Sequence, residues 1–163
     1  MRQETAESKF AENEIITILC VQWAARAKKM AAKYSLDYMV FKANNSITWV
    51  EVKDRPTWNG HDTFLLGFHK WMRAHEYLTY SKLPTILAVR LAGQLMTYNV
   101  NPLDIGEVEI IESGRRDRSE TDDIEPCVLI PIEKFSIFDA DNELWDGPLL
   151  PAAFDIKTIL KPY

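Results

Sequence analysis

Three charged residues, Asp37, Glu51 and Lys53, have the types and the spacing of a metal-dependent hydrolytic site. Thirteen residues separate the aspartate from the glutamate, and a single residue separates the glutamate from the lysine. Carboxylate oxygens are the ligands that Mg²⁺ prefers, and two carboxylates that face each other repel unless a cation lies between them. The lysine would add a positive charge beside that ion, where it can stabilise the negative charge of a transition state.

The stretch from 36 to 53 must bring these residues together, and its composition predicts a β-hairpin. β-branched and aromatic residues dominate both of its ends, and residues 43–46, Ala-Asn-Asn-Ser, have turn chemistry. If the loop has three residues centred on Asn44, Asp37 lies directly opposite Glu51, with the two Cβ atoms about 4.5–5.5 Å apart. Side chains alternate between the two faces of a strand, so the lysine shares the face of the glutamate.

The spacing Asp-x13-Glu-x-Lys resembles the core motif of the PD-(D/E)XK nuclease superfamily, although Leu36 stands where the superfamily's name has proline. The resemblance implies Mg²⁺-dependent hydrolysis of DNA phosphodiester bonds, with Mn²⁺ as a substitute for Mg²⁺. It also implies that Asp37, Glu51 and the backbone carbonyl of Val52 bind the metal. Lys53 would then orient the attacking water and stabilise the transition state, a role that we favour over that of a general base.

Residues 5–33 predict one long helix, because apolar residues recur at every third or fourth position. Glu12 lies on this apolar stripe, where a carboxylate needs a partner, and Glu14 lies on a second, smaller face. Many members of the superfamily carry an acid on this helix that points into the metal site. The resemblance therefore implies that Glu12, or alternatively Glu14, holds a second metal ion or a metal-bound water, whereas the helix dipole alone would also favour an early glutamate. The stripe consists of Ile15, Ile16, Leu19, Trp23 and Met30, and Lys28, Lys29 and Lys33 lie near the expected end of the helix.

Further along the chain, 54–62 predicts a loop, 68–81 a second helix, and 84–91 and 94–98 two strands. The order helix, strand, strand, helix, strand is that of the superfamily's core. We therefore expect an α/β fold with a restriction-endonuclease-like core, in which helices flank a central mixed β-sheet in the order α-β-β-α-β.

The last third of the chain predicts a short C-terminal β extension, in which strands at 108–111 and 127–132 pair with each other. Residues 114–126 form a dense mixed-charge loop between them. The pattern from this loop to residue 132 is similar to one in small phage-type members of the superfamily. The length of 163 residues fits a single nuclease-like domain spanning 1–163.

The resemblance implies DNA as the partner, and the distribution of charge is compatible with it. Residues 1–100 contain 13 Lys and Arg against 9 Asp and Glu, a balance of +4, whereas residues 101–163 contain 6 against 15, a balance of −9. Affinity for DNA depends on local cationic contacts with phosphates rather than on the total charge. Lys70 in the second helix and Arg55 after the hairpin are candidate DNA-binding residues, with ordinary solvated side chains as the alternative for both.

The composition also bears on where the protein works. No apolar run approaches the roughly 20 residues of a membrane span, and the polar, acidic start does not resemble a signal peptide. Cys20 and Cys127 are the only cysteines, which suits a reducing compartment and argues against a disulfide framework. We expect a protein of the bacterial or phage-infected cytoplasm that acts in DNA replication, recombination or repair. A homodimer is compatible with cutting both strands.

Three other functions fit parts of the pattern. A DNA-binding module of the same fold without catalysis would lack one of the three motif residues, and none is missing. A glycosidase would use the paired carboxylates but would give the lysine no task. A scaffold protein would carry Glu51 and Lys53 on a solvated face, yet Ile47 and Trp49 share that face by alternation and indicate that it is partly buried. The sequence leaves open whether cleavage is internal or terminal and which form of DNA is cut.

Overall fold

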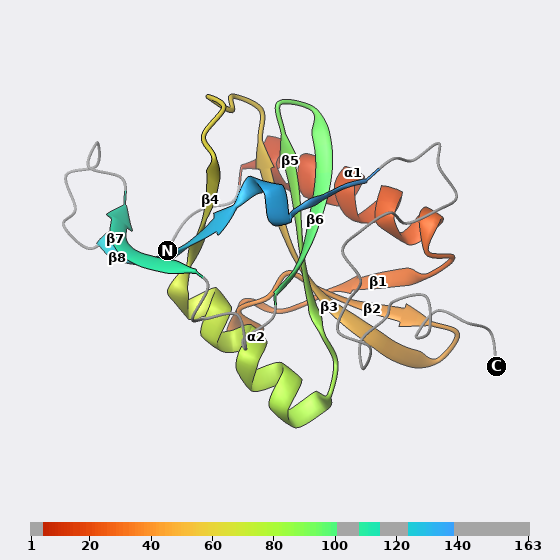
Figure 1. Cartoon of the computed structure of the whole chain (residues 1–163). Helices are drawn as coiled ribbons and strands as arrows, with labels where there is room; N and C mark the ends of the chain where they lie inside the picture. Colours follow the sequence, from red (N-terminus) through yellow and green to blue (C-terminus); the bar gives the residue numbers. More distant parts are fainter. Residues whose placement is uncertain (1–4, 101–107, 115–123, 139–163) are drawn as a thin grey trace.

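A computed structural model describes residues 5–100, 108–114 and 124–138 of the chain (Figure 1). The described elements are α1 (Ala6–Gln22), β1 (Arg26–Lys29), the 3-10 helix η1 (Ala32–Tyr34), β2 (Tyr38–Lys42), β3 (Asn45–Arg55), β4 (Thr63–Gly67), α2 (Phe68–Ser81), β5 (Thr85–Leu91), β6 (Gln94–Val100), β7 (Glu109–Gly114), β8 (Ile124–Pro131), the 3-10 helix η4 (Ile132–Lys134) and β9 (Ser136–Ile137). Within them, a six-stranded sheet has the order β1-β2-β3-β5-β6-β9, and a three-stranded sheet has the order β4-β8-β7. In the larger sheet β3 and β5 run parallel and the other neighbouring strands run antiparallel, so the central sheet is mixed, as expected.

The first helix is shorter than the apolar periodicity predicts. Thr5 caps its start by accepting a hydrogen bond from the Ser8 N–H, and the helix ends at Gln22. Ala24 then adopts a left-handed φ of 49°, and the chain leaves the helix axis. The prediction of a helix to residue 33 is therefore wrong, because residues 26–29 instead form β1 and gain a full hydrogen-bonded ladder with β2.

The buried stripe of α1 is the predicted one as far as the helix extends. Ile15, Ile16 and Leu19 are buried in one cluster with residues of β2, β3 and β5. Met30, which the long helix would have placed on this stripe, packs against a different cluster. Helix α1 therefore covers one side of the larger sheet, as Figure 1 shows.

The hairpin of β2 and β3 has the expected register near the motif but a different turn. Its loop is the two-residue Ala43–Asn44, not three residues centred on Asn44, and a one-residue shift in register follows between Val40 and Phe41. This β-bulge restores the predicted pairing further along, where Tyr38 pairs with Val50. Asp37 immediately precedes β2, and continuing this register would place it at the level of Glu51.

The bulge also changes which side chains share a face. Ile47 packs in the cluster of α1, whereas Trp49 packs with Met39 and contacts Tyr77 of α2 with ring centroids 4.4 Å apart. The expectation that Ile47 and Trp49 lie on the same face is therefore wrong, because alternation is interrupted by one residue between them. Trp49 and Glu51 are nevertheless both buried.

The second helix has the predicted bounds and forms the predicted crossover. Trp71 and Ala74 of α2 are buried, and the helix leads into β5, which lies parallel to β3 with Glu51 paired to Leu87. Helix, hairpin, helix and strand thus follow the expected order α-β-β-α-β, with β1 and β4 added to it. A glycine turn then joins β5 to β6, where Gly93 has a φ of 89°.

The smaller sheet contains the predicted pairing of the last third of the chain and one strand that we did not predict. β7 pairs with β8, as expected, although both strands are longer than 108–111 and 127–132 suggest. β4 pairs with the other edge of β8, so residues 63–67 form a strand. Its apolar residues Phe64 and Leu66 join Trp71 of α2 in the second core cluster.

Two further results concern membrane-spanning segments and the extent of the described residues. Neither described helix has the length and the hydropathy of a membrane-spanning segment. Most of the predicted charged loop 114–126, and the end of the chain from residue 139, lie outside the described residues.

Candidate active site

Asp37, the residue before β2, is held between Met30, which follows β1, and Val52 of β3. Its backbone carbonyl accepts a hydrogen bond from the Met30 N–H at 2.8 Å, and its Oδ2 accepts one from the Val52 N–H, also at 2.8 Å. Burial opposes the charged form of this carboxyl, but Lys53, the Val52 N–H and Lys29 more than offset it and lower the pKa of Asp37. Asp37 is therefore a fixed carboxylate at neutral pH.

Glu51 is only 1% exposed. It lies inside the protein because β3 has a neighbouring strand on each side. Its Oε1 is 2.5 Å from Lys53 Nζ, and its Oε2 is 3.0 Å from Lys70 Nζ of α2. Burial raises the pKa of Glu51, and the two lysines counteract part of that effect. The carboxylate thus has a cation at each oxygen.

Lys53 lies between the two motif carboxylates, 2.5 Å from Glu51 and 4.0 Å from Asp37 Oδ2. Burial disfavours its charge, but Glu51 and Asp37 outweigh this and raise the pKa of Lys53. The side chain therefore remains an ammonium cation at neutral pH. This favours electrostatic stabilisation over proton abstraction as its chemistry.

Glu12 and Lys29 extend the cluster toward α1. Lys29 Nζ lies 2.6 Å from Glu12 Oε2 and 3.6 Å from Asp37 Oδ1. Glu14, the alternative helix acid, is 2.5 Å from Arg90, which also binds Asp54. Of the two candidate acids, Glu12 is thus the one that Lys29 connects to Asp37.

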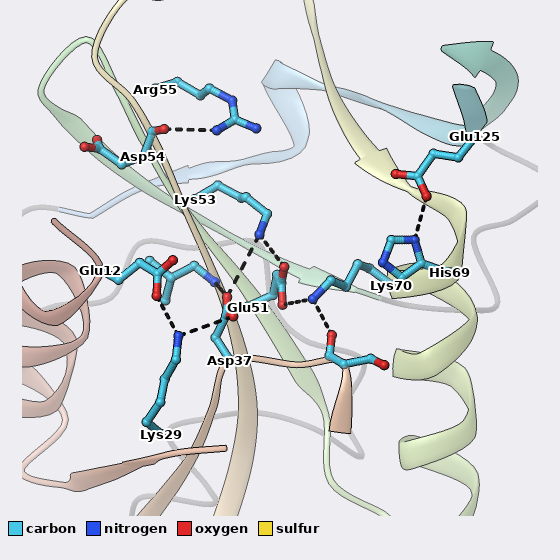
Figure 2. A network of polar contacts seen from close by, with 12 residues as sticks. Glu12, Lys29, Asp37, Glu51, Lys53, Asp54, Arg55, His69, Lys70 and Glu125 are labelled. Carbon is cyan, nitrogen blue, oxygen red and sulfur yellow. Dashed lines mark hydrogen bonds and ion pairs between the residues drawn. The ribbon is translucent and has the colours of Figure 1, made fainter. Parts of the chain in front are cut away.

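These side chains form one continuous row in which acids and bases alternate (Figure 2). We call it the charge network, and its members are Glu12, Lys29, Asp37, Lys53, Glu51 and Lys70. They come from α1, β1, the residue before β2, β3 and α2, so both helices contribute to it.

The two candidate DNA-binding residues have different surroundings. Lys70 also donates a hydrogen bond to the Ser35 carbonyl, so it belongs to the charge network and is not an ordinary solvated lysine. Arg55 lies at the end of β3, where its Nη1 donates to the Asp54 carbonyl at 3.1 Å, outside the network. In Figure 2 its guanidinium lies apart from the carboxylates of the motif.

The donors present fit a hard divalent cation. Asp37 and Glu51 supply carboxylate oxygens from neighbouring strands, and the Val52 carbonyl lies in the sequence between Glu51 and Lys53. No group of three His, Cys, Asp or Glu side chains in the described ranges is arranged to hold a metal.

Comparison with known proteins identifies the family of this chain. A family model described as "Phage putative PDDEXK endonuclease" matches residues 1–138. The chain belongs to this family. It is therefore a nuclease of the PD-(D/E)XK type, in agreement with the motif. No curated protein matches the chain.

Among solved structures, the nuclease is similar to Hjc, a Holliday junction resolvase from the archaeal hyperthermophile Archaeoglobus fulgidus. The TM-score is 0.47 with 13% sequence identity, and the match covers 76% of this chain and 85% of that chain.

Sequence reasoning missed one member of the charge network, Lys29. The sequence analysis placed Lys29 near the end of a long helix and assigned it no role in the site. Its role depends on the pairing of β1 with β2, in which Lys29 lies opposite Tyr38. An alternating pattern around Arg-Ala-Lys-Lys is too short to predict a strand. The other five members were candidate site residues from the sequence.

Proposed function

We propose that this nuclease hydrolyses DNA phosphodiester bonds with Mg²⁺ as its cofactor and Mn²⁺ as a working substitute. The observation that carries the proposal is the convergence of Asp37, Glu51 and Lys53 at one end of the hairpin. Asp37 is fixed there by the Val52 N–H, and Glu51 is enclosed by the sheet. A prepositioned pair of carboxylates with an adjacent cation is what phosphodiester hydrolysis requires of a protein.

The metal would be held by Asp37, Glu51 and the Val52 carbonyl. When bound, Mg²⁺ acts as a Lewis acid and lowers the pKa of a coordinated water. Lys53, which stays charged beside both acids, would orient the attacking water and stabilise the charge that develops on the phosphate. Because its pKa is raised, Lys53 is an unsuitable general base.

Contacts with the DNA backbone are proposed for Lys70 and Arg55. Lys70 donates to Glu51 and to the Ser35 carbonyl, and an ammonium group has three N–H donors. A phosphate oxygen would accept the third. Arg55 follows the motif on the same strand, two residues beyond Lys53, and would bind a neighbouring phosphate.

Several wider features of the proposal follow from the family and from the sequence. A role in phage or bacterial DNA processing, in the cytoplasm of the infected or bacterial cell, is our working hypothesis for this single domain of residues 1–163. A homodimer would allow both strands of a duplex to be cut. A DNA-binding module without catalysis is less well supported, because all three motif residues are present and lie together.

The proposal is tested by incubating the purified chain with circular and linear DNA and either Mg²⁺ or Mn²⁺. EDTA and the variant Lys53→Ala are the controls. We expect cleavage that EDTA abolishes and that Lys53→Ala lowers by about 10²–10³-fold, the usual effect of removing a group that stabilises transition-state charge. Cutting of the circular substrate would identify an endonuclease.

Two results would contradict the proposal. Cleavage by Lys53→Ala at the wild-type rate would remove the lysine from the mechanism. An absence of cleavage on duplex, single-stranded and branched DNA by a folded wild-type chain would favour the binding module. Circular dichroism of both proteins ensures that the comparison is made between folded chains.

A further inference from the structure

Lys29 occupies the gap between the helix acid and the first motif acid. Its Nζ is 2.6 Å from Glu12 Oε2 and 3.6 Å from Asp37 Oδ1, and it lies 4.7 Å from the centre of the Tyr38 ring. The ammonium therefore has an anion on each of two sides and an aromatic face on a third. These contacts come from α1, from the residue before β2 and from the first residue of β2.

The two acids beside Lys29 need a cation. The side chains of Glu12 and Asp37 are 14% and 15% exposed, so water screens their charges only partly. Lys29 supplies that cation, because its Nζ lies within ion-pair distance of both carboxylates. A permanent positive charge is thus built into the place where an acid on the first helix meets the motif.

We propose that Lys29 takes the place of a second divalent ion, so that this active site holds one metal ion rather than two. The inference rests on the proposed function, because it takes Asp37, Glu51 and the Val52 carbonyl as the ligands of that one ion. Glu12 is then a positioning residue that anchors Lys29, and it does not bind metal.

Space and charge both support one ion. An ion shared by Glu12 and Asp37 would have to displace the Lys29 ammonium from both carboxylates, whereas the ion between Asp37 and Glu51 has the Val52 carbonyl as an additional ligand. A metal ion placed beside the Lys29 ammonium would also be repelled by it, because the site is partly buried.

The net charge of the charge network also supports a single metal ion. Its three carboxylates face three lysines, so the network is close to neutral before any metal binds. One divalent ion adds two positive charges, which DNA phosphates can offset. A second ion would leave an excess of positive charge in a site that water screens poorly.

The test measures Mn²⁺ binding to the full-length protein without DNA, by titration calorimetry and by electron paramagnetic resonance of free Mn²⁺. We expect the wild type to bind one Mn²⁺ per chain. Lys29→Met keeps the length of the side chain and removes its charge, and we expect it to bind a second Mn²⁺ between Glu12 and Asp37. Adding Glu12→Gln to this variant should return the number to one.

Lys28→Met is the matched control, since it removes a charge from the same strand at a position paired with Met39. It should bind one Mn²⁺, like the wild type. Two ions on the wild type, or one ion on a folded Lys29→Met variant, would overturn the inference. Two ions on the double variant would overturn it as well, because the second ion would then be independent of Glu12.

Glu12→Gln alone keeps the inference testable if Lys29→Met does not fold. We expect one Mn²⁺ with an affinity within about threefold of the wild type, because a charge that is not a ligand acts only through screened Coulomb forces. Loss of one ion from this variant would identify Glu12 as a ligand and refute the inference. A folded wild type that binds no Mn²⁺ would instead refute the metal site of the proposed function itself, so the two failures are distinguishable.

Discussion

Glu51 carries a carboxylate into the interior, and its neighbours explain how the fold tolerates it. The residue is 1% exposed, and Lys53 and Lys70 each bind one of its oxygens. A buried charge that loses its partner is strongly destabilising. The two lysines therefore support the structure as well as any chemistry, and each of their variants needs a measurement of folding beside the measurement of activity.

At the same scale, Asp37 and Asp54 are two aspartates whose substitutions can be compared. Asp37 is a proposed metal ligand, whereas Asp54, one residue after Lys53, binds Arg90 at 3.0 Å. We expect Asp37→Asn to keep the hydrogen bond from the Val52 N–H and to weaken Mn²⁺ binding by about tenfold or more, roughly 1.4 kcal/mol, with loss of cleavage. Calorimetric titration and a cleavage assay measure the two effects.

Asp54→Asn serves as the control for this prediction. It should leave Mn²⁺ affinity unchanged and lower the free energy of unfolding by at most about 1 kcal/mol, because its ion pair with Arg90 is partly exposed. Equal losses of Mn²⁺ affinity in both variants would show that general charge, not ligation by Asp37, governs metal binding.

At the scale of elements, α1 matters because it carries Glu12 to the charge network. Its docking depends on Ile15, Ile16 and Leu19, which pack against β3 and its neighbours. A helix of 17 residues with one apolar face gains most of its stability from such packing rather than from its own propensity. The position of Glu12 relative to Lys29 therefore depends on this interface.

Leu19→Ala tests that dependence. Leu19 is fully buried, so we expect the free energy of unfolding to fall by about 2–5 kcal/mol through lost burial and a residual cavity. Val21→Ala on the same helix, where the side chain is 76% exposed, should change it by less than about 0.5 kcal/mol. Chemical denaturation gives both values, and similar losses for the two variants would contradict the docking of α1 through its buried stripe.

At the scale of the whole molecule, the charge is divided along the chain. The first 100 residues carry a balance of +4 and contain every proposed site residue, whereas residues 101–163 carry −9. DNA would therefore be bound by a small number of local cations, and the net negative charge of the last third of the sequence would disfavour binding. This predicts modest affinity with a clear dependence on salt.

Arg55→Ala tests this view of the DNA interface. Loss of one phosphate contact should reduce the slope of log affinity against log salt by about 0.9. Lys42→Ala is the control, because Lys42 adjoins the hairpin turn, five residues and thus about 16 Å along the strand from Asp37. Fluorescence anisotropy in metal-free buffer measures both slopes, and an equal change for the two variants would remove Arg55 from the interface.

Local patterns in the sequence were enough to predict much of this protein. Strand alternation and turn chemistry located the hairpin that presents Asp37, Glu51 and Lys53, and helical periodicity located α2 at residues 68–81 with its correct bounds. These features depend on residues close in the chain, because the periods of 2 and 3.6 residues act over short distances. The spacing of Asp37, Glu51 and Lys53 indicated the family, and the order of the elements indicated the α/β core.

Only the tertiary structure decided which charged residues meet. Lys29 joins the site because β1 pairs with β2, Glu12 rather than Glu14 faces Asp37 because of how α1 docks, and Lys70 reaches Glu51 from α2. The strand β4 likewise exists through its pairing with β8, some 60 residues later in the chain. The physical reason is that contacts between distant segments depend on strand pairing and packing, which periodicity within a single segment does not encode.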